Sequence, residues 1–205
     1  MNVLLINGSP HQNGSTFTAL NVIAEALHEE EIETSFFHLG NKPVYGCIAC
    51  AQCSATKRCV LTGDGVNTLI EAMAKADGII VGSPVYYAGP NGALCALLDR
   101  AFFLKDDLYA HKPAAAIVVC RRGGASSAFD RLNKYFTIAN MPVVSSQYWN
   151  AVHASTPADV LRDREGVQIM RVLGKNMAWM LKSLKHAALP PPAAPEWDRM
   201  DFHHG

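Results

Sequence analysis

Residues 4–18 read LLINGSPHQNGSTFT and contain, in this order, an apolar run, a group of turn formers and the start of a helical pattern. The apolar run at residues 3–6 has the short aliphatic character of a buried parallel strand. Residues 7–10, Asn-Gly-Ser-Pro, end that strand. Beyond them, apolar residues recur at helical spacing up to Leu27. The stretch predicts a strand, a polar loop and a helix N-terminus in direct succession.

Such a loop is suited to bind an anion. The first N–H groups of a helix lack intrahelical partners, and the positive end of the helix dipole faces the loop. Ser9, Ser15 and Thr16 add hydroxyl donors, and the loop has no Lys or Arg, so a phosphate held by neutral donors is the predicted ligand. Asn13 and His11 complete the candidate set, although His11 also fits as a simple polar loop residue. The alternative is an ordinary turn with a Ser/Thr cap.

Two related phosphate motifs are excluded by the spacing. No Gly-Lys-Ser/Thr sequence closes the loop, so it is not a Walker A motif. Gly8 and Gly14 do not fit the G-x-G-x-x-G pattern, so the dinucleotide fingerprint is absent as well.

Strand and helix patterns alternate along the rest of the chain. We expect strands at residues 34–39, 78–82, 114–120 and 142–148. We expect helices at residues 15–30, 66–75, 91–104 and 165–185, and a further helix that ends near residue 139. This alternation predicts an α/β fold with a parallel sheet and helices on both faces. The loops that begin near Ser9, Pro84 and Arg121 follow three of these strands and should converge at one edge of the sheet.

The chain is expected to form one domain. Residues 1–189 make up this domain, with a long loop inserted at residues 40–63. Residues 190–205 are a proline-rich tail, which cannot continue the preceding helix.

Composition excludes several classes of protein. The 205 residues include 18 basic and 18 acidic ones, so the net charge is zero and a broad basic surface for nucleic acid is not expected. No run of 18 apolar residues occurs, which argues against a membrane span. The start, MNVLLING, lacks the features of a signal peptide, so we expect a cytoplasmic protein.

Four of the six cysteines lie close together in the inserted loop, at Cys47, Cys50, Cys53 and Cys59. This clustering, without a secretory signal, favours metal or redox chemistry over disulfides. Three interpretations stay open. The thiolates hold a 4Fe-4S cluster; they bind zinc, although the spacing is closer than in usual zinc sites; or they are small buried residues or free thiols in a loop without metal.

Three of these stretches resemble the NAD(P)H-dependent oxidoreductases of flavodoxin-like fold. The loop at residues 9–16 resembles their FMN phosphate loop, and residues 83–92 resemble their second flavin loop. The cysteine motif resembles that of the iron–sulfur flavoproteins, a branch of this family. The resemblance spans residues 1 to about 150 and implies a flavodoxin-like three-layer sandwich with a five-stranded parallel sheet of order 2-1-3-4-5. It also implies FMN as cofactor and NAD(P)H as co-substrate.

The second flavin loop offers candidates for contacts with the flavin ring. The resemblance implies that its peptide groups meet the pyrimidine edge of the ring and that its aromatic side chains lie beside it. The candidate residues are Pro84, Val85, Tyr86, Tyr87 and Asn91. The alternative treats the two tyrosines as surface aromatics after a strand.

The loop after the expected strand at residues 114–120 supplies further candidates. An arginine at Arg121, near N1 and O2 of the flavin, would favour the negative charge of the reduced ring, and Gly123 and Gly124 allow close backbone approach. The alternative for Arg121 is the phosphates of NADPH, whereas Arg122 also fits as a solvated side chain. No acid–base pair points to a catalytic residue.

The expected function is an FMN-dependent NAD(P)H oxidoreductase that passes reducing equivalents to a small-molecule acceptor. Quinones, azo or nitro compounds, free flavin and a protein partner are all candidate acceptors. One alternative is an iron–sulfur flavoprotein that carries single electrons from a ferredoxin-like protein, and another is a non-catalytic redox or flavin sensor. The resemblance also implies a homodimer or homotetramer.

Overall fold

The centre of the protein is a sheet in which the strands β2-β1-β3-β5-β6 pair in this order. The structure, a computed structural model, describes residues 1–104 and 108–193. The strands are β1 (Asn2–Asn7), β2 (Glu33–His38), β3 (Gly78–Tyr86), β4 (Gly89–Pro90), β5 (Ala114–Cys120) and β6 (Ala151–His153). The helices are α1 (Ser15–Glu29), α2 (Cys53–Thr56), α3 (Val66–Lys75), α4 (Gly92–Phe102), α5 (Ala125–Ile138), α6 (Pro157–Arg162) and α7 (Arg164–Lys185). Residues 194–205 of the expected tail lie outside the described residues.

The sheet has the predicted flavodoxin-like order. The five strands of the central path pair in parallel, and the two-residue β4 adds one short antiparallel pairing at the end of β3. The three-layer sandwich is therefore confirmed, with β4 as an addition that the sequence pattern did not predict.

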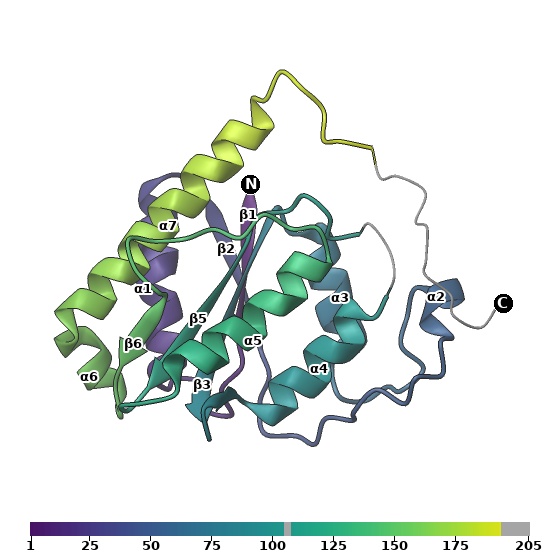
Figure 1. Cartoon of the computed structure of the whole chain (residues 1–205), viewed down its shortest axis with the longest axis horizontal. Coiled ribbons are helices and arrows are strands. Elements are labelled where there is room, and N and C mark those ends of the chain that lie inside the picture. The colour runs from purple at the N-terminus through teal and green to yellow at the C-terminus, as the bar shows by residue number, and fades with distance from the viewer. Residues whose placement is uncertain (105–107, 194–205) are drawn as a thin grey trace, which may run out of the picture.

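Helices cover both faces because successive strand residues point to opposite sides. Val3 and Leu5 of β1 pack into a core with α1 and α7, whereas Leu4 and Ile6 pack into a second core with α3, α4 and α5. Figure 1 shows this separation, with α1, α6 and α7 on one side of the strands and α3 to α5 on the other. Within the described residues, no helix combines the length and apolar character needed to cross a bilayer.

The prediction of the fifth strand at residues 142–148 is wrong. Only Val143 forms a bridge there, with Ala114, and the paired strand β6 begins later, at Ala151. Between the two, the side chain of Ser146 donates to Oδ1 of Asn150 at 2.7 Å, and Asn150 donates from Nδ2 to the carbonyl of Ala116 at 3.1 Å. The chain thus leaves the sheet through a polar bend. There the buried side chain of Asn150, rather than a backbone group of a neighbouring strand, donates to the carbonyl of Ala116.

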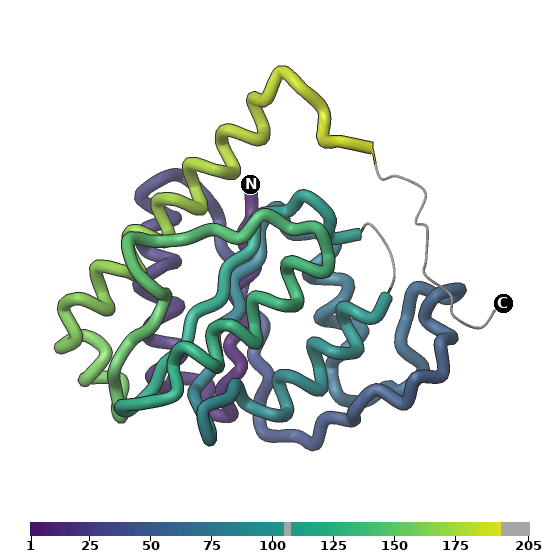
Figure 2. Tube along the Cα trace, viewed as in Figure 1, coloured from purple at the N-terminus to yellow at the C-terminus, as the bar shows by residue number. Residues whose placement is uncertain are grey.

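The loop at residues 40–63 lies at the periphery of the fold. Figure 2 shows the chain leaving β2, passing along the lower edge and extending beyond α4 before it returns to α3. The short α2 is its one helix within the described residues. Ala49, Ala51 and Lys57 have positive φ angles, an uncommon conformation for residues with a Cβ. The loop is therefore folded by specific contacts rather than by regular structure.

Candidate functional site

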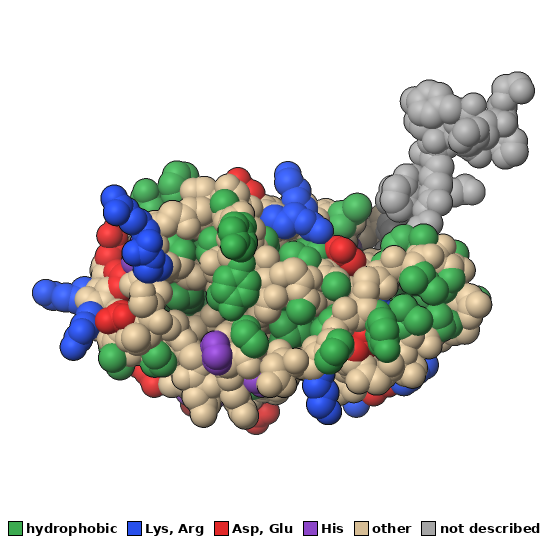
Figure 3. All heavy atoms as spheres, turned by 90° about the horizontal axis from the view of Figure 1, so that it is seen from below, with side chains coloured by type: hydrophobic (Ala, Val, Ile, Leu, Met, Phe, Trp, Pro, Cys, Tyr) green, Lys and Arg blue, Asp and Glu red, His purple; other side chains and the backbone are tan. Residues whose placement is uncertain are grey.

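The carboxyl ends of β1, β3, β5 and β6 surround one cavity of about 740 Å³. This volume lies in the range of small-molecule and cofactor sites. Most of the residues predicted to bind the cofactor line it: Ser9, His11, Asn13, Ser15, Thr16, Pro84, Val85, Tyr86 and Arg121. Figure 3 views the protein from below, and shows apolar side chains near the centre of this face. Further apolar side chains lie on the side of the loop at residues 40–63, called the cysteine loop below. The predicted convergence of the three loops is confirmed.

The loop after β1 is shaped by two buried polar side chains, Asn7 and Ser9. Oδ1 of Asn7 accepts a hydrogen bond from the backbone N–H of Ser9 at 3.1 Å, and Nδ2 of Asn7 donates to the carbonyl of Gln12 at 3.1 Å. Oγ of Ser9 in turn accepts from the N–H of His11 at 3.1 Å. These bonds fix the loop before any ligand arrives. Asn7, expected from the sequence only to help end the strand, thus determines the shape of the loop that lines the cavity.

The N-terminus of α1 opens onto this loop without a side-chain cap. Gly14 occupies the cap position, and in the described part of the chain the backbone N–H groups of Ser15, Thr16 and Phe17 have no partner. Asn91 caps α4 and Asp163 caps α7, whereas α3 and α5 also begin without a side-chain cap but contribute no residue to the lining of this cavity. Free N–H groups at a helix start form an anion site.

The charge of the cavity also suits an anion. Among the described residues that line it, none is acidic, and Arg121 and His11 supply its basic groups. The hydroxyl and amide side chains of the phosphate loop make up much of the remaining polar lining. Pro84, Val85 and Tyr86 form the wall contributed by β3. The lining therefore combines the donors of the loop after β1 with an apolar wall from β3 and a single guanidinium group.

Four predicted residues lie just outside the cavity. Asn91 donates from Nδ2 to the carbonyl of Gly8 at 2.8 Å and accepts from the N–H of Ala93, so it connects the phosphate loop to α4. Gly124 has a φ of +84°, and a Cβ there would lie 2.6 Å from Cα of Ala88. Tyr87 is fully exposed at the tip of the β3–β4 turn, and Gly123 is exposed as well. Asn91 therefore joins two segments by hydrogen bonds, and Gly124 allows the loop after β5 to pack closely against Ala88.

The cavity also includes residues that the sequence analysis missed, namely Ala154, Ser155 and Pro157. They follow β6 and were overlooked because the fifth strand was expected to end earlier. A signal was present in the sequence: Thr156 and Asp159 form a capping box, a known mark of a helix start.

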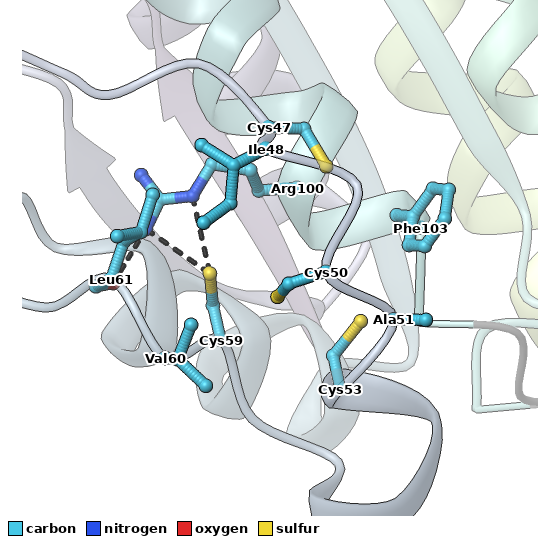
Figure 4. A pocket seen from close by; sticks show the side chains of 10 residues that line it. All are labelled: Cys47, Ile48, Cys50, Ala51, Cys53, Cys59, Val60, Leu61, Arg100 and Phe103. Carbon is cyan, nitrogen blue, oxygen red and sulfur yellow. Dashed lines mark hydrogen bonds between the residues drawn. The ribbon is translucent and has the colours of Figure 1, made fainter.

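The four clustered cysteines line a second, smaller pocket at the far side of α4. Cys47, Cys50, Cys53 and Cys59 contribute to it together with apolar side chains and Arg100. Figure 4 shows their sulfur atoms around this shared space. In the described residues, no three potential ligands stand in metal-binding positions. The donor set, four thiols in an apolar pocket beside a buried cation, nevertheless suits an iron–sulfur cluster.

The cysteines differ in their surroundings. Burial raises the pKa of the Cys53 thiol, and the neighbouring Cys59, Cys47 and Cys50 add to this effect. Cys47 and Cys50 are exposed. Outside the loop, burial also raises the pKa values of Cys95, which is half-buried, and of Cys120, which is buried.

The flavodoxin-like fold and the family match together show that this protein is a flavoprotein of the oxidoreductase class. Residues 1–156 match the NADPH-dependent FMN reductase family, and the chain belongs to this family.

Two relatives of known name are similar to most of this chain. The chain is 33% identical over 193 residues to an iron–sulfur flavoprotein of Methanocaldococcus jannaschii, with 90% of this chain and 100% of the relative covered. It is 27% identical over 167 residues to an NADPH azoreductase of a Bacillus species, with 81% of each chain covered.

Solved structures share the fold at low identity. An NADH:FMN oxidoreductase in its apo form aligns with a TM-score of 0.62 at 21% identity and 89% coverage of both chains. An archaeal flavodoxin aligns with a TM-score of 0.58 at 14% identity, covering 89% of this chain and 99% of that one.

Proposed function

We propose that this protein binds FMN at the carboxyl edge of its sheet, accepts reducing equivalents from NAD(P)H and passes them to a second acceptor. The observation that carries this proposal is the uncapped N-terminus of α1, which faces a cavity of about 740 Å³ with no acidic residue among its described lining. Bound FMN would supply the hydride and electron chemistry.

The phosphate loop would hold the phosphate of FMN. The free N–H groups of Ser15 and Thr16 and the nearby hydroxyl groups provide donors without a formal charge. The bonds of Asn7 and Ser9 fix these donors in advance, so little ordering is needed when the ligand binds.

The opposite end of the cavity would hold the flavin ring. Pro84, Val85 and Tyr86 would border the ring, and Arg121 would stabilise negative charge on its reduced form. Because Arg121 is exposed, it could instead contact the phosphates of NADPH, which is its alternative role. Acceptors such as quinones, azo or nitro compounds and free flavin fit an open cavity of this kind, and the azoreductase relative supports testing azo compounds.

A second function is favoured by the cysteine pocket. Four cysteines line one space, and a relative that is 33% identical to this chain is named an iron–sulfur flavoprotein. We propose that they hold a 4Fe-4S cluster, which would allow single-electron exchange with a ferredoxin-like partner. A cytoplasmic location and a homodimer or homotetramer stay predictions. Light scattering tests the oligomer, and a monomeric mass at micromolar concentration would contradict it.

The FMN site can be tested with a charge placed at the helix start. Ser15→Glu puts a carboxylate at the expected phosphate position and should abolish FMN binding. Ser126→Glu adds the same charge to the first turn of α5 and serves as the matched control, since Ser126 does not line the cavity. FMN content after purification is the readout. Full FMN occupancy in Ser15→Glu would overturn the proposed phosphate site.

A further inference from the structure

Arg100 is buried, although arginine is rarely found without contact to water. Its relative exposure is 2%, and it lies in the last turn of α4, on the side of that helix away from the flavin cavity. A buried guanidinium is costly unless its N–H groups are satisfied. The hydrogen-bond partners of Arg100 therefore indicate which segment this residue stabilises.

The hydrogen bonds of the Arg100 guanidinium go to the cysteine loop (residues 40–63) and to Asp64, which directly follows it. Nη1 pairs with the carboxylate of Asp64 and donates to the carbonyl of Tyr45 at 3.2 Å. Nη2 donates to the carbonyl of Leu61 at 2.5 Å. Nε and Nη2 each donate to Sγ of Cys59 at 3.3 Å. One side chain of α4 thus joins the beginning and the end of the loop.

The two edges of the guanidinium contact different partners. Asp64, whose side chain is 1% exposed, balances its charge and also accepts the N–H of Tyr45 at 3.1 Å. The opposite edge, Nε and Nη2, meets the sulfur of Cys59 as a fork, as Figure 4 shows. A fork of two N–H groups suits an acceptor with negative charge, such as a thiolate bound to iron.

The same helix reaches the flavin site at its other end. Asn91, its cap, donates to the carbonyl of Gly8 in the phosphate loop. Arg100 follows nine positions later, which corresponds to about 14 Å along a helix. The contacts of α4 therefore fix the cysteine loop relative to the cavity.

We propose that Arg100 is a positioning residue that folds the cysteine loop for iron binding and donates two N–H groups to the sulfur of Cys59. This inference rests on the iron–sulfur cluster proposed above. Hydrogen bonds to cluster sulfurs raise the reduction potential, because they stabilise the added negative charge of the reduced cluster. Arg100 should thus affect both the retention of iron and the potential of the cluster.

The test compares Arg100→Lys with the parent protein after anaerobic reconstitution with iron and sulfide. Lysine retains the charge beside Asp64 but cannot place a planar fork on Cys59. We expect iron to be lost to a chelator roughly 10-fold faster or more, as is typical when a partner of a metal ligand is removed. The iron that remains should be reduced at a lower midpoint potential. FMN content should be unchanged.

Arg58→Lys is the matched control. Arg58 precedes Cys59 in the same loop, but it is exposed and pairs with Glu71. This variant should retain iron and potential at the parent level. A parent-like iron release and potential in Arg100→Lys would overturn the inference. A parent protein that binds no iron would overturn the proposed cluster, and this inference with it.

If Arg100→Lys fails to fold and loses FMN as well, a double variant tests the role of Arg100 instead. Arg100→Gln combined with Asp64→Asn leaves no buried charge unpaired, so the fold should survive. It removes the fork and should therefore show the same selective loss of iron with FMN retained. Retention of iron and potential at parent levels in this variant would overturn the inference equally.

Discussion

Asn91 and Gly8, which are 83 positions apart in the chain, are joined by a hydrogen bond of 2.8 Å from Nδ2 to the carbonyl oxygen. The same side chain caps α4 through the N–H of Ala93. Its own N–H donates to Oγ of Ser83 at 2.9 Å. One asparagine thus connects β1, β3 and α4 beside the flavin cavity, although it does not line that cavity.

Asn91→Ala should lower the free energy of unfolding by about 1 to 2 kcal/mol, because it removes a helix cap and a half-buried hydrogen bond. Asn91→Asp keeps an acceptor for Ala93 but cannot donate to Gly8. It should recover the part of the stability that comes from the cap, and FMN binding should be weaker in both variants than in the parent protein. Urea unfolding and FMN titration measure the two effects. Equal FMN affinity in all three proteins would contradict a role for this link in the cofactor site.

Arg121→Met should lower the potential of the two-electron flavin couple and slow reduction by NAD(P)H, with FMN still bound. A unit charge near a developing charge is worth about 1 kcal/mol in water. Because Arg121 is exposed, this low figure applies, and it corresponds to about 20 mV for a two-electron couple.

Arg122→Met is the control for Arg121, since Arg122 is the exposed neighbour that does not line the cavity. Spectroelectrochemical titration gives the potential of each variant. If Arg121→Met instead weakens NADPH binding at an unchanged flavin potential, Arg121 contacts the nucleotide phosphates. An unchanged potential and an unchanged NADPH affinity would exclude both roles.

Asp64 should make stability depend on acid pH. Burial alone would raise the pKa of this carboxyl, but the hydrogen bonds from Arg100 and from the N–H of Tyr45 outweigh it and hold the pKa below the ordinary value of 3.8. A group with a lowered pKa in the folded state stabilises the fold above its unfolded pKa and loses this effect as the pH falls.

At neutral pH, Asp64→Asn should therefore cost about 3 kcal/mol or more, because Arg100 remains buried without its partner. The difference from the parent protein should shrink as the pH falls below about 4. Glu71→Gln, which breaks the exposed pair with Arg58, should have little effect at any pH. Urea unfolding of the iron-free protein from neutral pH to about pH 3 measures these differences. A pH-independent cost of Asp64→Asn would contradict this account.

Much of the fold follows from the sequence because its strands are short apolar runs between turn formers. β5 occupies the predicted residues 114–120. The loop at residues 9–16 lines one cavity together with Pro84 and Arg121, as predicted. The fifth strand was misplaced, since Val143 and Val144 resemble a strand whereas the actual pairing starts at Ala151. The deciding bonds of Asn150 join positions far apart in the chain, and no local pattern shows them.

The same limit applies to the two sites. Donor types and loop order predict from sequence which loop after β1 lines the cavity, and the close spacing of the four cysteines predicts that they lie together. Asn7 and Arg100 were missed, because their roles depend on partners in folded loops: Asn7 within its own turn, and Arg100 at Asp64 and Cys59, 36 and 41 positions away. A polar residue in an otherwise apolar strand or helix face was the signal available for both.

Anaerobic reduction of the purified protein by NADH or NADPH, followed by visible spectroscopy, tests the central claim most directly. The account predicts a yellow protein that releases FMN, not FAD, on denaturation. It also predicts that the absorbance of the oxidised flavin disappears when a nicotinamide is added, and returns when an acceptor such as a quinone or azo dye follows. A protein that neither contains nor binds FMN, or whose bound FMN is reduced by neither nicotinamide, would contradict it.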